Sequence, residues 1–161
     1  MKIPLLSVVT LCIGLSGCGL SGCEKCEGVP SASEAGISII LLNASGTQNL
    51  FTPPTNYNRD SVRVSDEQGK ELVIAKASAA PGRINFSLFE RGKLPALEQP
   101  VVRQFLLYLK YSDRDTVRVE CELYQPDCTN PDLKKVVIFY NNKKVHEGNS
   151  AFIPELIIRK P

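Results

Sequence analysis

The amino-acid sequence predicts an all-β fold: an antiparallel β-sandwich of about eight or nine short strands, with immunoglobulin-like topology as the default. Short apolar or alternating segments are separated by turns rich in Gly, Pro, Asn and Asp, and no convincing amphipathic helix interrupts them. Tryptophan is absent, so the Cys…Trp…Cys pattern of antibody domains is absent too. These observations leave the strand order open.

Four segments up to residue 88 predict strands. Residues 37–42 form an apolar run rich in β-branched side chains, which is typical of a buried strand. Residues 61–65 alternate, 66–70 form a turn, and 71–75 lead the chain back, which predicts a hairpin. Residues 83–88 alternate again and predict a half-buried strand.

The next strands are expected over 101–111 and 116–123. The first is rich in aromatic and aliphatic residues and suits a central strand, although a helix is possible for part of it. The second alternates most clearly, with apolar residues on one face and charged residues on the other. Between them, Asp113 and Asp115 are expected in a turn.

The last part of the chain predicts a hairpin and a final strand. A strand over 135–140 is followed by a tight turn at 141–143, where asparagine tolerates the positive φ that such turns require. Residues 144–146 pair back. The final strand, 151–158, contains a proline, which favours an edge strand or a bulge.

Residues 1–17 have the composition of a secretory leader. A positive start precedes a short apolar run that is too short to span a bilayer. The run ends in Leu15-Ser16-Gly17-Cys18, which resembles the lipobox of bacterial lipoproteins. The resemblance implies cleavage by signal peptidase II before the cysteine, a diacylglycerol on its sulfur and an acyl chain on its amino group.

A second tetrapeptide, Leu20-Ser21-Gly22-Cys23, also fits the lipobox. Lipidation of Cys18 leaves an even set of cysteines at 23, 26, 121 and 128, whereas lipidation of Cys23 leaves an odd set. An unpaired thiol is unfavourable in an oxidising compartment, so Cys18 is the preferred lipidation site and Cys23 the alternative.

The mature chain is expected to consist of a lipidated flexible tether, residues 18–35, and one β-sandwich domain, residues 36–161. The tether is dominated by Gly, Ser and Glu and lacks apolar periodicity. No second apolar stretch is long enough to cross a membrane. We therefore expect lipid-only attachment in the bacterial cell envelope, at the outer membrane, facing the periplasm or the surface.

Two cysteine pairs are candidates for disulfides. Cys121 lies on an inward strand position and Cys128 follows across a turn-rich loop, so we expect these two to be joined; two reduced, buried cysteines are the alternative. Cys23 and Cys26 form a Cys-x-x-Cys that could be a local disulfide. A redox or zinc role is less favoured, because the motif follows no strand and has no nearby second ligand pair.

The sequence contains few candidates for catalysis, and we expect neither enzymatic activity nor a cofactor. The single histidine, His146, lies on a lysine-flanked hairpin strand and is expected at the surface. The carboxylate pairs Asp113/Asp115 and Glu120/Glu122 are expected to be solvated rather than catalytic. No nucleophile elbow, phosphate-binding loop or zinc-protease motif occurs.

No metal site is expected either. Residues 56–60, with Glu67 further on, imitate the oxygen-ligand spacing of a calcium loop. Ser61 stands where that loop requires glycine, and a strand rather than a helix follows. The surface could offer tyrosines as a sugar platform, but most of the five tyrosines are expected in or near the core.

The body of the chain resembles small uncharacterised lipoproteins of Bacteroidota. The similarity is carried by Ser45–Phe51, Tyr57–Val64, Asp115–Val117, Cys128 and Val137–Asn142. It implies a lineage and no activity.

The formal net charge is +2 and no basic stripe with interleaved aromatics occurs, so we expect no nucleic-acid partner. The favoured hypothesis is a lipid-anchored, non-catalytic sandwich that binds a protein or a glycan or has a structural role. The alternative is an inhibitor of an envelope-degrading lysozyme or protease that uses the 122–132 loop. A hydrolase based on carboxylates or a Ser–Lys pair is less favoured.

Overall fold

The computed structural model describes residues 32, 35–54, 57–74, 82–90, 93–125, 131–149 and 153–161. The leader, the tether up to residue 31, and Cys128 lie outside these ranges. Eight strands and one short 3₁₀ helix, η3 (Arg59–Ser61), make up the described fold. The strands are β1 (Gly36–Leu42), β2 (Arg63–Ser65), β3 (Arg83–Ser87), β4 (Pro100–Lys110), β5 (Asp113–Tyr124), β6 (Asp132–Tyr140), β7 (Lys143–Gly148) and β8 (Leu156–Arg159).

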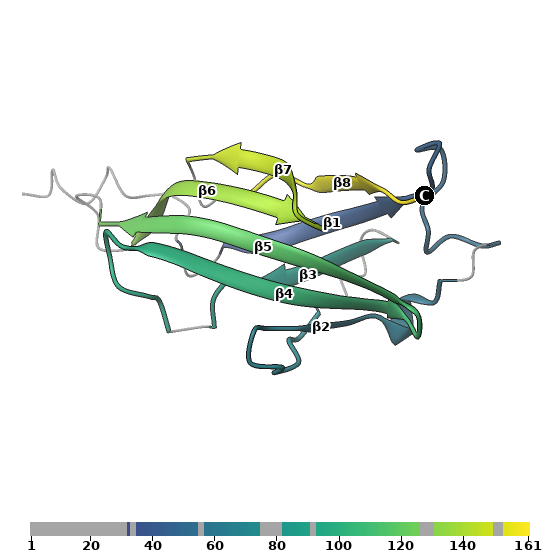
Figure 1. The fold of residues 1–161 in the computed structure, drawn as a ribbon, viewed down its shortest axis with the longest axis horizontal. Helices are drawn as coiled ribbons and strands as arrows, with labels where there is room; N and C mark the ends of the chain where they lie inside the picture. The colour runs from purple at the N-terminus through teal and green to yellow at the C-terminus, as the bar shows by residue number, and fades with distance from the viewer. Residues whose placement is uncertain are drawn as a thin grey trace, which may run out of the picture.

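The strands form two sheets that pack face to face (Figure 1). The larger sheet has the order β2-β4-β5-β6-β7 and is antiparallel throughout. The smaller sheet has the order β3-β1-β8, in which β1 pairs antiparallel with β3 and parallel with β8. The predicted all-β sandwich is therefore confirmed.

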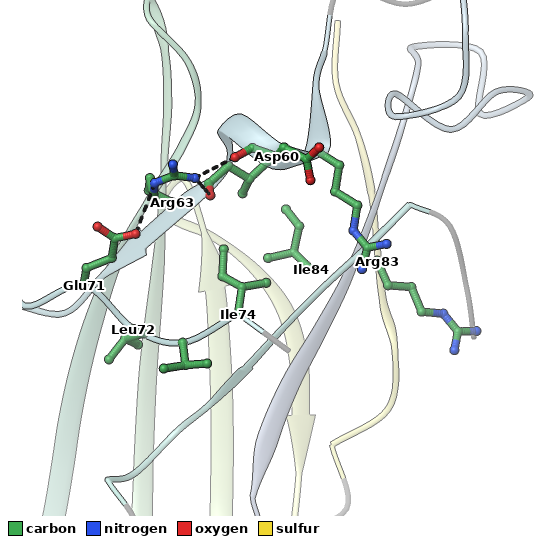
Figure 2. A pocket seen from close by; sticks show the side chains of 10 residues that line it. Asp60, Arg63, Glu71, Leu72, Ile74, Arg83 and Ile84 are labelled. Carbon is green, nitrogen blue, oxygen red and sulfur yellow. Dashed lines mark hydrogen bonds and ion pairs between the residues drawn. The ribbon is translucent and has the colours of Figure 1, made fainter. Parts of the chain in front are cut away.

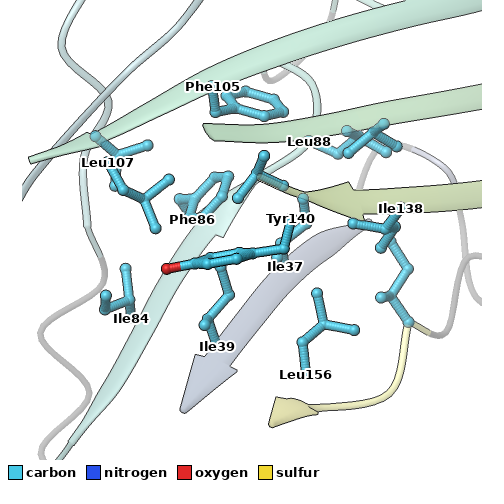
Figure 3. Packing of buried hydrophobic residues seen from close by; sticks show 14 of the residues in the cluster. Ile37, Ile39, Ile84, Phe86, Leu88, Phe105, Leu107, Ile138, Tyr140 and Leu156 are labelled. Carbon is cyan, nitrogen blue, oxygen red and sulfur yellow. The ribbon is translucent and has the colours of Figure 1, made fainter. Parts of the chain in front are cut away.

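The alternation of side chains explains why these segments form strands with one buried face. Along β5, from Asp115 to Leu123, every second residue is buried. Successive residues of a strand point to opposite faces, so the buried positions of β5 face the smaller sheet. The two sheets meet in one apolar core (Figure 3). Phe86 of β3 and Phe105 of β4 join the sheets directly, with ring centroids 5.1 Å apart in an edge-to-face arrangement.

The topology differs from that of a constant-type immunoglobulin domain. Strands β4 to β7 form a four-strand meander within one sheet, whereas the ABED/CFG arrangement places no more than two consecutive strands side by side. The cause is the short connections between these strands. Their turns favour pairing of neighbours within one sheet over crossing to the other.

Most of the predicted elements are found, with shifts at their ends. The whole of 101–110 is strand, so the helical alternative for part of this segment is wrong. The turn at Asn141 and Asn142 is confirmed, and both residues have positive φ. Chain reversal after β2 is also confirmed, but Glu71 makes only an isolated bridge to Ser65 instead of starting a strand. The final strand lies at the edge of the smaller sheet, as predicted, but it begins at Leu156, so Pro154 precedes it instead of interrupting it.

Two predicted boundaries are wrong. Asp113 and Asp115 lie within β5, not in a turn. The strand predicted over 135–140 begins earlier, at Asp132. The 122–132 loop of the inhibitor hypothesis therefore includes the end of β5, which continues to Tyr124, and the first residue of β6. Among the described residues no helix is long and apolar enough to cross a membrane.

Candidate functional site

The lipidation candidates Cys18 and Cys23, together with Cys26, lie outside the described residues, so their roles stay predictions. Cys121 is described: it is a free, buried cysteine on the inner face of β5. Burial raises the pKa of its thiol to about 11, although the nearby Arg103 charge acts against the rise. The thiol is therefore protonated at neutral pH and a poor nucleophile. The predicted disulfide to Cys128 stays a prediction.

The two aspartates at the start of β5 face the interior of the sandwich. Lys160, which follows β8, donates to Asp113 Oδ1 at 2.6 Å and also to Asp115 Oδ2. Tyr57 donates to Asp113 Oδ2 at 2.6 Å, and Tyr140 donates to Asp115 Oδ2 at 2.6 Å. All of these groups are half-buried or buried, with Asp115 only 3% exposed. We call this group the buried carboxylate cluster.

Every carboxylate oxygen of the cluster has a donor within the protein, since Asn141 Nδ2 donates to the remaining oxygen of Asp115 at 2.5 Å. Burial acts to raise the pKa of Asp113, but the hydrogen bonds from Lys160 and Tyr57 outweigh burial and hold this pKa below its usual value. Burial, and then the hydrogen bond to Asp113, raise the pKa of Tyr57 to about 12. The cluster thus joins Lys160 to the larger sheet through charge-assisted hydrogen bonds, with one ammonium shared by two carboxylates.

The other polar candidates are dispersed over the surface. Glu120 and Glu122 lie on the outer face of β5, where they form ion pairs with Arg118 at 3.1 Å and Lys134 at 2.8 Å, respectively. His146 is half-buried on the edge strand β7, opposite Ile138.

The residues of the calcium-like segment are also used within the fold. Asn58 Oδ1 accepts a hydrogen bond from the Asp60 N–H at 2.9 Å and caps η3. Glu67 pairs with Arg103 at 2.9 Å. In the described part of the chain, no group of three or more His, Cys, Asp or Glu side chains is placed to hold a metal ion.

Several hollows open on the described surface, and three of them lie around β2 and the segment that follows it. These three share Glu71 as a lining residue, and Arg63 of β2 lines two of the three. Arg63 Nε and Glu71 Oε1 form an ion pair at 3.1 Å. This pair borders a groove between the two sheets, which we call the inner groove, and a hollow on the outer face of the larger sheet, which we call the outer hollow.

The inner groove lies between the edges of the two sheets and has a volume of about 550 Å³ (Figure 2). This volume is within the usual range of ligand pockets. Arg83 at the groove is held by Glu155 at 2.5 Å. Arg59 also lines the groove, and its buried Nη2 has no hydrogen-bond partner among the described residues. The apolar side chains of the lining are Val62, Leu72, Val73, Ile74 and Ile84.

The outer hollow has a volume of about 620 Å³ and is built on three neighbouring strands. Strand register places Arg63 opposite Tyr108 and Tyr108 opposite Arg114, so a tyrosine stands between two arginines. The Arg114 guanidinium lies over the Tyr108 ring, 5.1 Å from its centroid. Tyr111, in the turn between β4 and β5, is 100% exposed.

The lining of the outer hollow carries an excess of positive charge. Arg63, Lys110 and Arg114 face one carboxylate, Glu71, which is already paired with Arg63. Lys110 lies over the Tyr57 ring at 4.6 Å from its centroid, and its charge contributes to the lowered pKa of Asp113. Within the described ranges, no ion pair joins Arg114 to a carboxylate. Arg114 therefore presents an exposed guanidinium whose hydrogen-bonding capacity is available to a ligand.

Sequence reasoning missed this site because it placed most tyrosines in or near the core. Tyr140 is buried and Tyr57 is half-buried beneath Lys110, but Tyr108 and Tyr124 are only half-buried on the outer face and Tyr111 is fully exposed. A partial signal was present: Tyr108 and Tyr111 flank a lysine beside a turn, and Arg114 follows that turn. The missing information was the register between β2, β4 and β5.

Comparisons with known proteins identify no relative: no family model, no curated protein and no solved structure matches the chain. The resemblances to lipoproteins given above therefore stay predictions.

Proposed function

We propose that this protein is a lipid-anchored, non-catalytic binding protein of the bacterial cell envelope, and that its β-sandwich binds a ligand around β2. The leader and the Leu15-Ser16-Gly17-Cys18 tetrapeptide support the anchor. In this proposal Cys18 carries the lipid, with Cys23 as the alternative, and the tether holds the sandwich at the outer membrane.

The proposed binding role rests on a contrast between the polar groups inside the sandwich and those around β2. The aspartates Asp113 and Asp115, one of the two carboxylate pairs considered for catalysis, have donors on all their oxygens. Around β2, by comparison, two hollows of ligand size carry guanidinium groups, on Arg59 and Arg114, that retain unused donors. Tyrosine and arginine are the residues most enriched where binding energy concentrates. This distribution favours recognition over bond-breaking chemistry.

The anchor is tested by intact mass spectrometry of the protein extracted from native membranes. We expect a triacylated chain beginning at Cys18, and we expect Cys18→Ser to abolish the lipid while Cys23→Ser leaves it in place. An unmodified chain that begins elsewhere would overturn the anchor. The same spectra with and without reduction test the Cys121–Cys128 disulfide, which we expect in an oxidising compartment.

The binding role is tested by site-specific photo-crosslinking in the full-length, membrane-anchored protein. A photoreactive phenylalanine replaces Tyr111 at the outer hollow or, as the matched control, Tyr124 at the other end of β5. We expect an envelope component to be captured from position 111 and not from position 124. Equal capture from both positions, or none from either, would contradict a binding site at the outer hollow.

The inhibitor hypothesis for the 122–132 loop stays a prediction, because 126–130 lie outside the described residues.

A further inference from the structure

We infer that the outer hollow binds an acidic glycan, one whose sugar rings carry carboxylate groups. This inference rests on the proposed function, since it names the ligand class of the binding site around β2. It is built from the arrangement of aromatic, cationic and hydroxyl groups that line the hollow.

The aromatic component is Tyr111. Its ring is fully exposed at the tip of the β4–β5 turn. Leaving an aromatic ring in water forfeits the stabilisation that its burial would provide. A tyrosine ring offers an apolar face for the C–H face of a pyranose, while its hydroxyl stays hydrated or bonds a sugar hydroxyl. Tyr111 can therefore act as the stacking platform.

The cationic component is Arg114. Stacking on Tyr108 holds the guanidinium plane, and the register of β4 and β5 places the two residues directly opposite each other. A planar guanidinium matches a carboxylate with two parallel N–H donors, and a pre-positioned side chain loses less conformational entropy on binding. Lys110 also lines the hollow, but its ammonium lies over the Tyr57 ring and interacts with Asp113, so Arg114 is the cation available to a ligand. A neutral sugar would leave this charge uncompensated.

The remaining lining favours a polyhydroxylated ligand over an apolar protein surface. Ser61, Ser65 and the Glu71 carboxylate line the hollow, and none of its lining residues is aliphatic. Hydroxyl and carboxylate groups exchange hydrogen bonds with sugar hydroxyls, whereas the core of a protein interface is depleted in charged residues and serine. The hollow therefore combines a stacking ring, a guanidinium for the carboxylate of the ligand and the hydroxyl of Ser65; Ser61 Oγ already donates to the Asn58 carbonyl at 2.7 Å.

The larger sheet supplies an internal control. Arg118 lies over the Phe139 ring at 4.3 Å, on the same outer face, but its guanidinium is paired with Glu120 at 3.1 Å. The two arginines thus share strand β5 and a cation–π contact. Arg118 has a buried Nε without a hydrogen-bond partner among the described residues, but a carboxylate already pairs with its charge, whereas none pairs with that of Arg114 in the described ranges. Only Arg114 is expected to bind an external carboxylate.

The test is isothermal titration of the full-length protein in detergent with two oligosaccharides, hexagalacturonate and the neutral maltohexaose. We expect binding of hexagalacturonate that weakens as sodium chloride rises to about 0.5 M, because salt screens exposed charges. We expect binding to weaken about tenfold or more in Arg114→Gln and in Tyr111→Ala. Binding should weaken less in Arg114→Lys. The control variants Arg118→Gln and Tyr124→Ala should bind as tightly as the unmodified protein.

Four results would overturn the inference. Equal binding of both oligosaccharides would show that the hollow does not select acidic glycans. Equal losses for Arg114→Gln and Arg118→Gln would place the ligand elsewhere on the sheet. Absence of glycan binding, combined with capture of a protein by the crosslinker at position 111, would replace the glycan with a protein ligand and leave the proposed binding function in place. Failure of both experiments would overturn the inference and the binding site together.

Discussion

Near the β4–β5 turn, neighbouring residues of the larger sheet have different roles on its two faces. On the inner face, Asp113 and Asp115 have donors from Lys160, Tyr57 and Tyr140. On the outer face, Arg114 and Tyr108 face solvent and share only a stacking contact with each other. The alternation of a β-strand separates the two sets, because consecutive side chains point to opposite sides.

The difference indicates which charged residues stabilise the fold and which are available to bind a ligand. A buried charge must be compensated inside the protein, because removal from water is costly. An exposed charge needs no such partner, so its position is free to serve a ligand. The comparison predicts that substitutions on the inner face change stability and that those on the outer face change binding.

The largest effect on stability is expected for Lys160→Met. This change leaves Asp115, whose side chain is 4% exposed, without its cation, and removing one partner of a buried pair costs about 3–5 kcal/mol. The free energy of unfolding from urea denaturation measures the loss. Lys135→Met is the matched control, since Lys135 is exposed in a 3.8 Å ion pair with Glu147 and should change stability by about 0.5 kcal/mol at most. Similar losses for both variants would contradict the special role of Lys160.

A smaller effect is expected for Tyr140→Phe, which removes one donor from Asp115 and keeps the ring in the core. A hydrogen bond to a charged group contributes about 1.5–3 kcal/mol. The same denaturation measurement applies, with Tyr108→Phe as the control on the outer face. If Tyr140→Phe is as stable as Tyr108→Phe, the hydroxyl of Tyr140 contributes nothing to the cluster.

The pH dependence of the cluster gives a third test. Burial and the hydrogen bond to Asp113 raise the pKa of Tyr57 from the ordinary value of 10.0 to about 12. The folded protein holds the proton of the Tyr57 hydroxyl more tightly than the unfolded chain does. The contribution of this hydroxyl to the free energy of unfolding is therefore fully present below pH 10 and is lost as the pH rises towards 12. The pKa of Tyr140 is raised as well, by burial and by its hydrogen bond to Asp115, so tyrosinate absorbance should show late titration of both residues. Tyr57→Phe should remove the step near pH 12, and Asp113→Asn should move this step to lower pH. A titration curve unchanged in both variants would count against the Tyr57–Asp113 bond.

The smallest effect on stability is expected for the outer face. Arg114→Gln removes an exposed stacked cation that has no ion pair in the described ranges, and it should change the free energy of unfolding by less than about 0.5 kcal/mol. The control is Lys160→Met, measured in parallel. A loss above about 2 kcal/mol for Arg114→Gln would show that Arg114 serves the fold and would erase the contrast between the two faces.

Much of the fold could be predicted from the sequence, because its strands alternate with period two. The segment 116–123 shows this well: its apolar positions are the buried positions of β5. The beginning of β5 was missed since Asp113 and Asp115 place charges at inward positions, which is the composition of a turn. Their cation, Lys160, lies 45 positions from Asp115 along the chain, so no local pattern could reveal the pairing.

The candidate binding site was harder to predict than the strands. Arg63, Tyr108 and Arg114 lie on three different strands, and only the pairing registers place them in one row. Tertiary pairing of this kind has no signature in a single strand. Strand order was unpredictable for the same reason, and the four-strand meander emerged only from the pairing.

The most direct test of the division between the two faces is amide chemical-shift mapping of the full-length protein in detergent, titrated with hexagalacturonate. We predict saturable chemical-shift changes in the segments that line the outer hollow, 61–65 and 108–114, and no progressive changes in β6 and β7. Shifts centred on the β6–β7 hairpin or on the far end of β5 would contradict this prediction. Such shifts would show that Arg114 and Tyr111, near the β4–β5 turn, do not form the binding site.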